Sequence, residues 1–270
     1  MDIISSLPDP ILCHILSFLP ILHSSVETSV LARRWRYLWT YVRDLHFGAD
    51  YYDPFYYYTK PRKSVRFSDM VDRVLLMHNG SIDTLTIESN ENTSISEHQI
   101  DAWIHTAMAH GVHDFFLSDV WFPQFHCKCK NLVKLTLKRC TISIEPGAVC
   151  LPRLKKLCLL SNSYKNDRSL PNLVSGCSAV ELLCDFDHKH KLVLDVPAVQ
   201  DLRIQDDTTQ IIRAYNISSL VRANICFLNG YVVADIRRPR YIFQFIEKLS
   251  NAKSLKIQVR IRRGYVLCLR

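Results

Sequence analysis

A short apolar pattern recurs along most of this 270-residue chain and limits the folds that it can adopt. Each copy reads apolar-x-x-apolar-x-apolar, and successive copies begin 19 to 32 residues apart. Such spacing is typical of repeat architectures, in which each unit supplies one short strand and a neighbouring unit covers its apolar face. The pattern therefore predicts stacked parallel strands. The copies begin at Ile82, Val112, Leu132, Leu154, Val180, Val199, Leu220 and Ala252.

The fifth copy is read as Val180-x-x-Leu183-x-Asp185, which places Leu183 on the inner face. The residues between inward positions should form the opposite, concave face of the sheet. They predict a mixed, mostly basic surface and no particular ligand. This set includes Lys134, Thr136, Lys156, Cys158, Asp201 and Arg203.

Helices are predicted in the two longest intervals and ahead of the first copy. Ser96–Ala109 opens with a Ser96-x-x-Gln99 capping box, and its apolar face holds Ile100, Trp103, Ile104 and Ala107. Tyr241–Leu249 also has helical spacing, as does Ser64–His78, which Asn79-Gly80 should stop. Residues from about Val42 to Arg62 are expected to form a linker or long loop.

The N-terminal stretch Leu7–Trp39 carries three helical signals. The first helix has an apolar face with i, i+3, i+4 spacing. A capping box at Ser24–Glu27 predicts a second helix, and Trp35 and Trp39 lie on one side of a third. About 40 residues cannot bury this much apolar surface internally. Some of it must face the rest of the chain or another protein.

The same stretch resembles the F-box of plant F-box/leucine-rich-repeat proteins. The resemblance rests on Leu7-Pro8-Asp9, Ile15-Leu16-Ser17-Phe18-Leu19-Pro20 and Arg34-Trp35-Arg36-Tyr37-Leu38-Trp39. This sequence differs from the family pattern at Pro10, at Ile21–Ser25 and at Ala32, where the family usually has an acidic residue, a polar segment and a Ser. The repeats also resemble that family, of the F-box/LRR or F-box/FBD/LRR type, and the chain looks short beside members with a further C-terminal domain.

The resemblance implies an α/β fold: a three-helix F-box at 1–45, a linker and connecting helix at 46–80, and an irregular leucine-rich-repeat solenoid at 81–270 with a parallel sheet on its concave face. It implies docking to a Skp-type adaptor, and through it to a cullin–RING ubiquitin ligase, while the repeats bind an unknown substrate protein. The adaptor-binding residues by resemblance are Leu7, Pro8, Ile11, Leu12, Ile15, Leu16, Leu19, Val30, Leu31, Trp35, Leu38 and Trp39. Sequence does not sort the adaptor-facing residues from the internal core.

Composition excludes several other classes. We find no glycine-rich phosphate loop, no signal peptide and no apolar run long enough to cross a bilayer, so we expect an intracellular protein of the nucleus or cytoplasm. The 10 cysteines lack a framework and are expected to be reduced, which leaves His126-Cys127-x-Cys129 as a weak zinc alternative. We identify no catalytic constellation and expect no enzyme activity, cofactor or metal.

Two alternatives remain open. The net charge of +8 permits a repeat protein that binds nucleic acid and has no ligase role, although a solvated basic surface is the simpler interpretation. The basic runs are Arg33–Arg36, Lys60–Arg66, Arg237–Arg240 and Arg260–Arg263. An inactive, truncated family member is the other alternative.

Overall fold

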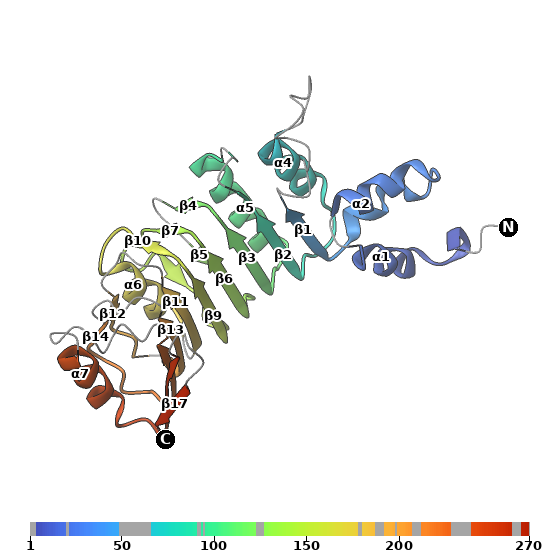
Figure 1. Cartoon of the computed structure of the whole chain (residues 1–270). Helices are drawn as coiled ribbons and strands as arrows, with labels where there is room; N and C mark the ends of the chain where they lie inside the picture. Colours follow the sequence, from blue (N-terminus) through green and yellow to red (C-terminus); the bar gives the residue numbers. More distant parts are fainter. Residues whose placement is uncertain are drawn as a thin grey trace, which may run out of the picture. The chain divides into compact units, whose positions relative to one another are not determined.

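The computed structural model is mixed α/β, with helices at the N-terminus followed by parallel strands (Figure 1). It describes residues 4–19, 22–48, 66–90, 93, 95–122, 127–177, 180–186, 192–197, 199–206, 212–227, 239–260 and 266–269. Two compact units form, Met1–Val120 and Trp121–Arg270. Most of the basic run at 60–66, and the side chains of the runs at 237–240 and 260–263, lie outside the described residues.

The first unit begins with short helical elements. Their bounds are η1 Ile4–Ser6, α1 Asp9–Ser17, α2 Leu22–Glu27, η2 Thr28–Val30 and η3 Trp35–Tyr41, where η denotes a 3-10 helix. The predicted capping box at Ser24–Glu27 is wrong. Helix α2 already begins at Leu22, which puts Glu27 at its last residue. The third predicted helix is a 3-10 helix instead of an α-helix.

A parallel sheet of β1 (Asp44–Gly48), β2 (Thr84–Glu88) and β3 (Asp114–Ser118) follows in the first unit. Its register places apolar side chains side by side, and the residues that face the core are Leu45, Phe47, Leu85, Ile87, Phe115 and Leu117. Strand β1 lies where the sequence predicted a loop from Val42 onward. Residues 49–62 of that predicted loop lie outside the described part of the chain.

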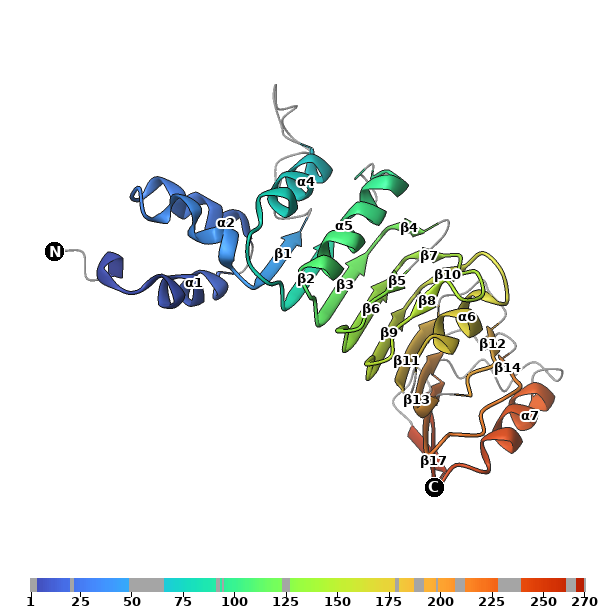
Figure 2. The same cartoon turned by 180° about the vertical axis from the view of Figure 1, so that it is seen from behind.

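Helices α4 (Phe67–Met77) and α5 (Glu97–Ala109) lie on the same side of this sheet (Figures 1 and 2). The capping box of Ser96 and Gln99 is confirmed, and the predicted apolar face of α5 is buried. Asp72 of α4 joins the two helices, since its carboxylate accepts hydrogen bonds from the side chains of Gln99 (2.8 Å) and Trp103 (2.6 Å). The amphipathic pattern therefore predicted both helices and their buried sides.

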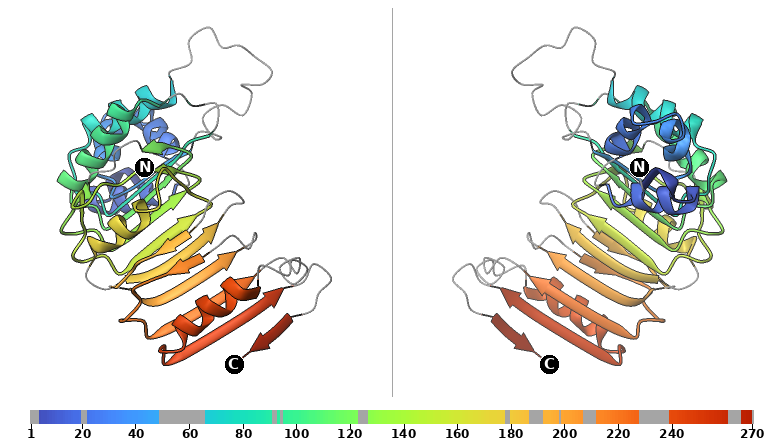
Figure 3. Two further views of the ribbon diagram at one scale, coloured as in Figure 1. Left: turned by 90° about the vertical axis from the view of Figure 1, so that its left-hand side faces the viewer. Right: turned by 90° about the vertical axis from the view of Figure 1, so that its right-hand side faces the viewer.

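The second unit is built on a ladder of long strands that run side by side (Figure 3). All neighbours are parallel except the last pair, which is antiparallel. In order, the strands are β6 (Lys134–Lys138), β9 (Lys156–Leu160), β11 (Val180–Phe186), β13 (Val199–Asp206), β15 (Arg222–Phe227), β16 (Ser254–Arg260) and β17 (Val266–Leu269). Leu135, Leu157 and Leu202 lie on the buried side of this ladder.

Shorter elements cover that buried side. They are β4 (Trp121–Phe122), β7 (Thr141–Ile142) and β10 (Ser163–Tyr164), which pair together, then β5 (Cys127–Lys128) with β8 (Val149–Cys150), β12 (Leu192–Leu194) with β14 (Ile212–Ala214), and helices α6 (Ser169–Ser175) and α7 (Pro239–Leu249). The core of this unit therefore lies between the long strands and a second, irregular layer.

The chain turns from a long strand into this second layer by a repeated device. Arg139 follows β6 and Ser161 follows β9, both with positive φ, at 50° and 52°. The buried side chain of Asn162 then spans the turn, since its oxygen accepts from the Cys140 N–H and its nitrogen donates to the Leu137 carbonyl, both at 2.8 Å. Asn162 thus provides hydrogen-bond partners for two backbone groups at the end of β6.

The predicted register of the fifth copy is wrong. Leu182 and Cys184 are fully buried, while Leu183 faces the other side of the sheet and is half-buried. The buried residues Val180, Leu182 and Cys184 alternate without interruption, and Glu181–Asp185 pairs with β9 in unbroken register. The extra residue at the pairing shift lies in β13, between Val199 and Asp201. Strand β11 has no such extra residue, so its residues after Val180 face the opposite side from the one that the i, i+3, i+5 pattern predicted.

Candidate functional site

Many of the exposed apolar side chains of the first unit lie on its N-terminal elements. Ile11 is 46% exposed, Ile15 39%, Val30 86% and Leu31 69%. All were predicted to bind an adaptor, and Pro8, which caps α1, is exposed as well. Burying a large aliphatic side chain is worth about 1.5–3 kcal/mol. This set therefore offers a partner considerable binding free energy.

The remaining predicted residues form the internal core of these helices. Leu12, Leu16, Trp35, Leu38 and Trp39 are each no more than 6% exposed. Their burial follows from the contacts of α1 and α2 with η3. Leu7 and Leu19 are half-buried, so their exposure is intermediate between that of the exposed group and that of the buried group.

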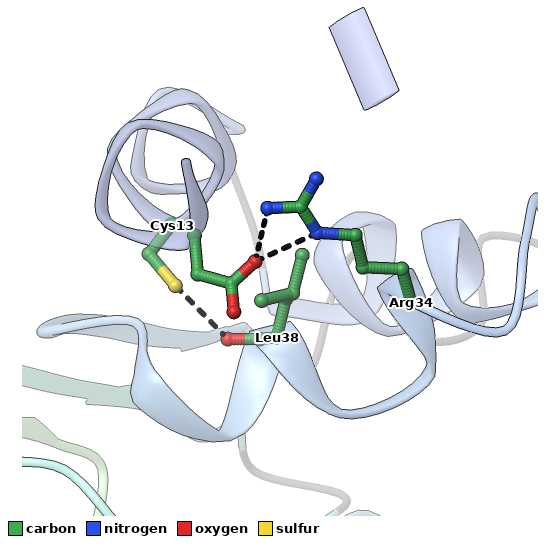
Figure 4. A network of polar contacts seen from close by, with 4 residues as sticks. Cys13, Arg34 and Leu38 are labelled. Carbon is green, nitrogen blue, oxygen red and sulfur yellow. Dashed lines mark hydrogen bonds and ion pairs between the residues drawn. The ribbon is translucent and has the colours of Figure 1, made fainter. Parts of the chain in front are cut away.

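Polar contacts fix α1 against the segment that carries Val30 and Leu31 (Figure 4). The Arg34 guanidinium donates to one carboxylate oxygen of Asp9 from both Nε (2.8 Å) and Nη2 (2.6 Å). Beside it, the Cys13 thiol donates to the Leu38 carbonyl at 3.5 Å, and burial, aided by the Asp9 carboxylate, raises the pKa of that thiol. The exposed apolar residues of α1 and of 30–31 therefore belong to neighbouring, tied elements.

Four exposed apolar residues of these N-terminal elements are absent from the predicted adaptor-binding set. They are Phe18, Tyr37, Ile4 and Tyr41, which are 73%, 60%, 54% and 52% exposed. Phe18, the C-cap residue of α1, is seven residues after Ile11 and three after Ile15, which is the helical spacing of one side. This spacing is the sequence signal that groups Phe18 with the exposed residues Ile11 and Ile15.

A second candidate surface is the side of the long strands that faces away from the core. The strand register aligns it in rows, and one row runs Lys134, Lys156, Glu181, Asp201 and Arg222. Arg203 lies within 3.3 Å of Glu181 and 3.6 Å of Asp201, and Arg222 donates to Asp201 at 2.8 Å. Thr136 and Cys158, predicted on this face, are buried in its floor at 5% exposure.

The cysteines of the described residues are free thiols. Cys127, Cys129 and Cys177 are buried, and burial raises the pKa of Cys177 to about 12. His126 of the weak zinc alternative lies outside the described residues, and within the described part of the chain no three side chains of the metal-binding types come together. The helices that the structure describes are all too short or too polar to cross a lipid bilayer.

Comparison with known proteins finds family matches for two stretches of the chain. Residues 4–47 match the F-box domain, and residues 100–228 match a family described as FBD-associated F-box protein At5g56370, LRR repeats. The FBD-associated F-box protein At5g38590 of Arabidopsis thaliana is 30% identical over 95% of this chain and 67% of its own length. The chain belongs to the family of FBD-associated F-box proteins with LRR repeats.

Further members of the FBD-associated F-box family align with the chain over different extents. The putative FBD-associated F-box protein At5g50270 of Arabidopsis thaliana is 30% identical over 100% of this chain and 68% of its own length. The F-box/FBD/LRR-repeat protein At5g56420 of the same plant is 32% identical over 75% of this chain. The chain spans about half of that relative, 49% of its length. No solved structure matches the sequence.

Proposed function

We propose that this FBD-associated F-box family member is the substrate-recognition subunit of a Skp–cullin–F-box ubiquitin ligase. Its N-terminal helices form the F-box and dock a Skp-type adaptor. Its repeats form a leucine-rich-repeat solenoid that binds the target protein. Ubiquitin transfer is carried out by other subunits, so the role requires no catalysis by this chain.

One observation carries the proposal: an F-box match coincides with an apolar set left exposed on tied helices. Ile11, Val30 and Leu31 are between 46% and 86% exposed, although the same helices bury Leu12 and Leu16 almost completely. Exposed aliphatic anchors around a rigid core are the usual composition of a protein-docking surface. We assign Ile11, Ile15, Val30 and Leu31, with Phe18, to the adaptor-facing side.

The test is capture of the chain by a plant Skp-type adaptor. Ile11→Asp combined with Val30→Asp places charges among the proposed anchors and should weaken capture by about 100-fold or more, since two central anchors are lost. Leu76→Asp combined with Met77→Asp is the matched control, because these two side chains are 86% and 46% exposed on α4 of the same unit. Circular dichroism of each variant verifies folding. Equal capture of both variants would refute the assignment.

A further inference from the structure

Among the side chains that the structure describes, the sheet face of the second unit that points away from the core carries more cations than anions. Glu181 and Asp201 are both within 4 Å of arginines. The neighbouring strands β6 and β9 contribute only cations to this face. Among its described side chains the cations are Lys134, Lys138, Lys156, Arg203, Arg222 and Lys256, and the anions are Glu181 and Asp201.

Lys134 and Lys156 lie directly opposite each other on adjacent parallel strands. Neighbouring strands are roughly 4.8 Å apart, so two like charges in this position repel each other. Lys138 lies at the other end of β6, four residues along. Neither Lys138 nor Lys156 has an ion-pair partner among the described residues. A bound anionic group would give Lys138 and Lys156 an ion-pair partner.

The floor between these lysines is neutral and partly apolar. Thr136 and Cys158 are opposite each other in the register and each is 5% exposed. Burial raises the pKa of the Cys158 thiol, so the floor carries no negative charge at neutral pH. Half-buried Leu160 and Leu183 border it. The surface thus offers a place for one apolar side chain between two positively charged ends (Figure 2 locates β6, β9 and β11).

The spacing matches an extended peptide. Residues four apart on a strand are separated by about 13 Å and point to the same side. Lys134 and Lys138 have this relation on β6, with Lys156 beside the first of them. An extended ligand with acidic residues at positions i and i+4 has the same spacing, and its residue i+2 faces the floor.

We infer that this face, formed by Lys134, Lys138, Lys156, Thr136, Cys158 and Leu183, binds an extended segment of the target protein with the pattern acidic-x-apolar-x-acidic. The inference rests on the proposed function, in which the repeats bind the target. A nucleic acid fits less well, because the row of Lys134 and Lys156 continues into Glu181 and Asp201. A phosphate backbone that crossed the strands along this row would meet those carboxylates.

Fluorescence anisotropy with the full chain tests the inference. The probe is a labelled peptide of about ten residues that contains Asp-Ser-Leu-Ser-Asp, and the comparison peptide has the same composition with its acidic residues three apart, on opposite sides of a strand. We expect the first to bind at least about fivefold tighter, and both to weaken as salt is added. Equal affinity of the two peptides would overturn the inference, as would tighter binding of a single-stranded oligonucleotide.

Charge-reversal variants locate the site. Lys138→Glu with Lys156→Glu should weaken probe binding at least about tenfold, and the milder Lys138→Gln with Lys156→Gln should weaken it in the same direction. Lys128→Glu with Lys130→Glu is the matched control, since both residues are exposed in the same unit and the net charge changes equally. Loss of binding in the control alone, or in neither pair, would contradict the site.

Adaptor capture is measured on the same samples. Failure of the peptide to bind while the adaptor is captured overturns only this inference. Failure of adaptor capture while the peptide binds leaves the sheet-face site in place and removes the ligase assignment.

Discussion

Replacing Asn162 by Ala should destabilise the second unit out of proportion to the atoms removed. The side chain is 4% exposed, and it pairs the N–H of Cys140 and the carbonyl of Leu137 at 2.8 Å each. Both backbone groups lie at the turn after β6. Alanine leaves both groups without these partners in a site that is closed to water.

The magnitude follows from two orphaned groups. A buried donor or acceptor that loses its partner costs about 1–3 kcal/mol, so the loss of both should lower the free energy of unfolding by about 2–6 kcal/mol. Domains of this size are stable by about 5–15 kcal/mol in total. The loss should therefore be visible as a large shift of the unfolding midpoint.

Urea denaturation followed by far-UV circular dichroism measures this loss. Asn131→Ala is the control, since Asn131 is exposed in the same unit and should change the free energy of unfolding by less than about 0.5 kcal/mol. Asn162→Asp keeps an oxygen that accepts from the Cys140 N–H, but it places a carboxylate next to the Leu137 carbonyl. Relative to wild type this variant should be least destabilised at low pH, where the protonated carboxyl group can donate to that carbonyl. An Asn162→Ala loss as small as that of the control would refute the reasoning.

Three further perturbations test other parts of the structure. Tyr164→Phe should leave the free energy of unfolding unchanged or raise it by about 1 kcal/mol, because the Tyr164 hydroxyl is buried without a hydrogen-bond partner in the described part of the chain. A loss of more than about 1 kcal/mol in thermal unfolding would contradict this prediction. Gly176→Ala should destabilise by about 1–3 kcal/mol, because a Cβ there collides with the carbonyl of Val149, and protease resistance equal to wild type would count against it. His78 is buried beside His110. Its burial is the main cause that lowers the pKa of His78 from 6.5 to about 4, and the neighbouring imidazole of His110 lowers it further. Between pH 6.5 and pH 4 the unfolded chain therefore binds more protons than the folded chain, so the free energy of unfolding falls as the pH drops through that window. His78→Leu removes this group and should make the melting temperature fall less over the same pH range.

Local patterns in the sequence were enough to predict helices α4 and α5 of the first unit. The capping box at Ser96 and Gln99 was read correctly because both partners lie within one helical turn, so no distant contact decides it. The same kind of motif at Ser24–Glu27 failed. There the helix begins two residues earlier, and the buried hydroxyl of Ser25 donates to the carbonyl of Leu16 on the preceding helix.

The positions of the strands in the sequence were also predicted well, but the side of the sheet that their residues face was predicted wrongly for one strand. Leu135 and Leu137 face the core as their alternation requires. Leu183 was placed on the wrong side because the i, i+3, i+5 pattern was applied to β11, although the extra residue that this pattern requires is present in β13 and absent from β11.

The amino-acid sequence by itself determined that this chain contains N-terminal helices, a series of short strands and an F-box-like set of apolar residues, because periodicity and motif are local properties. Only the tertiary structure divided that set, burying Leu12, Leu16 and Trp35 and leaving Ile11, Val30 and Phe18 exposed. It also placed Lys134 beside Lys156, which are 22 positions apart in the chain. Both results depend on which elements pack together, and the free energy of that packing is summed over contacts between distant residues.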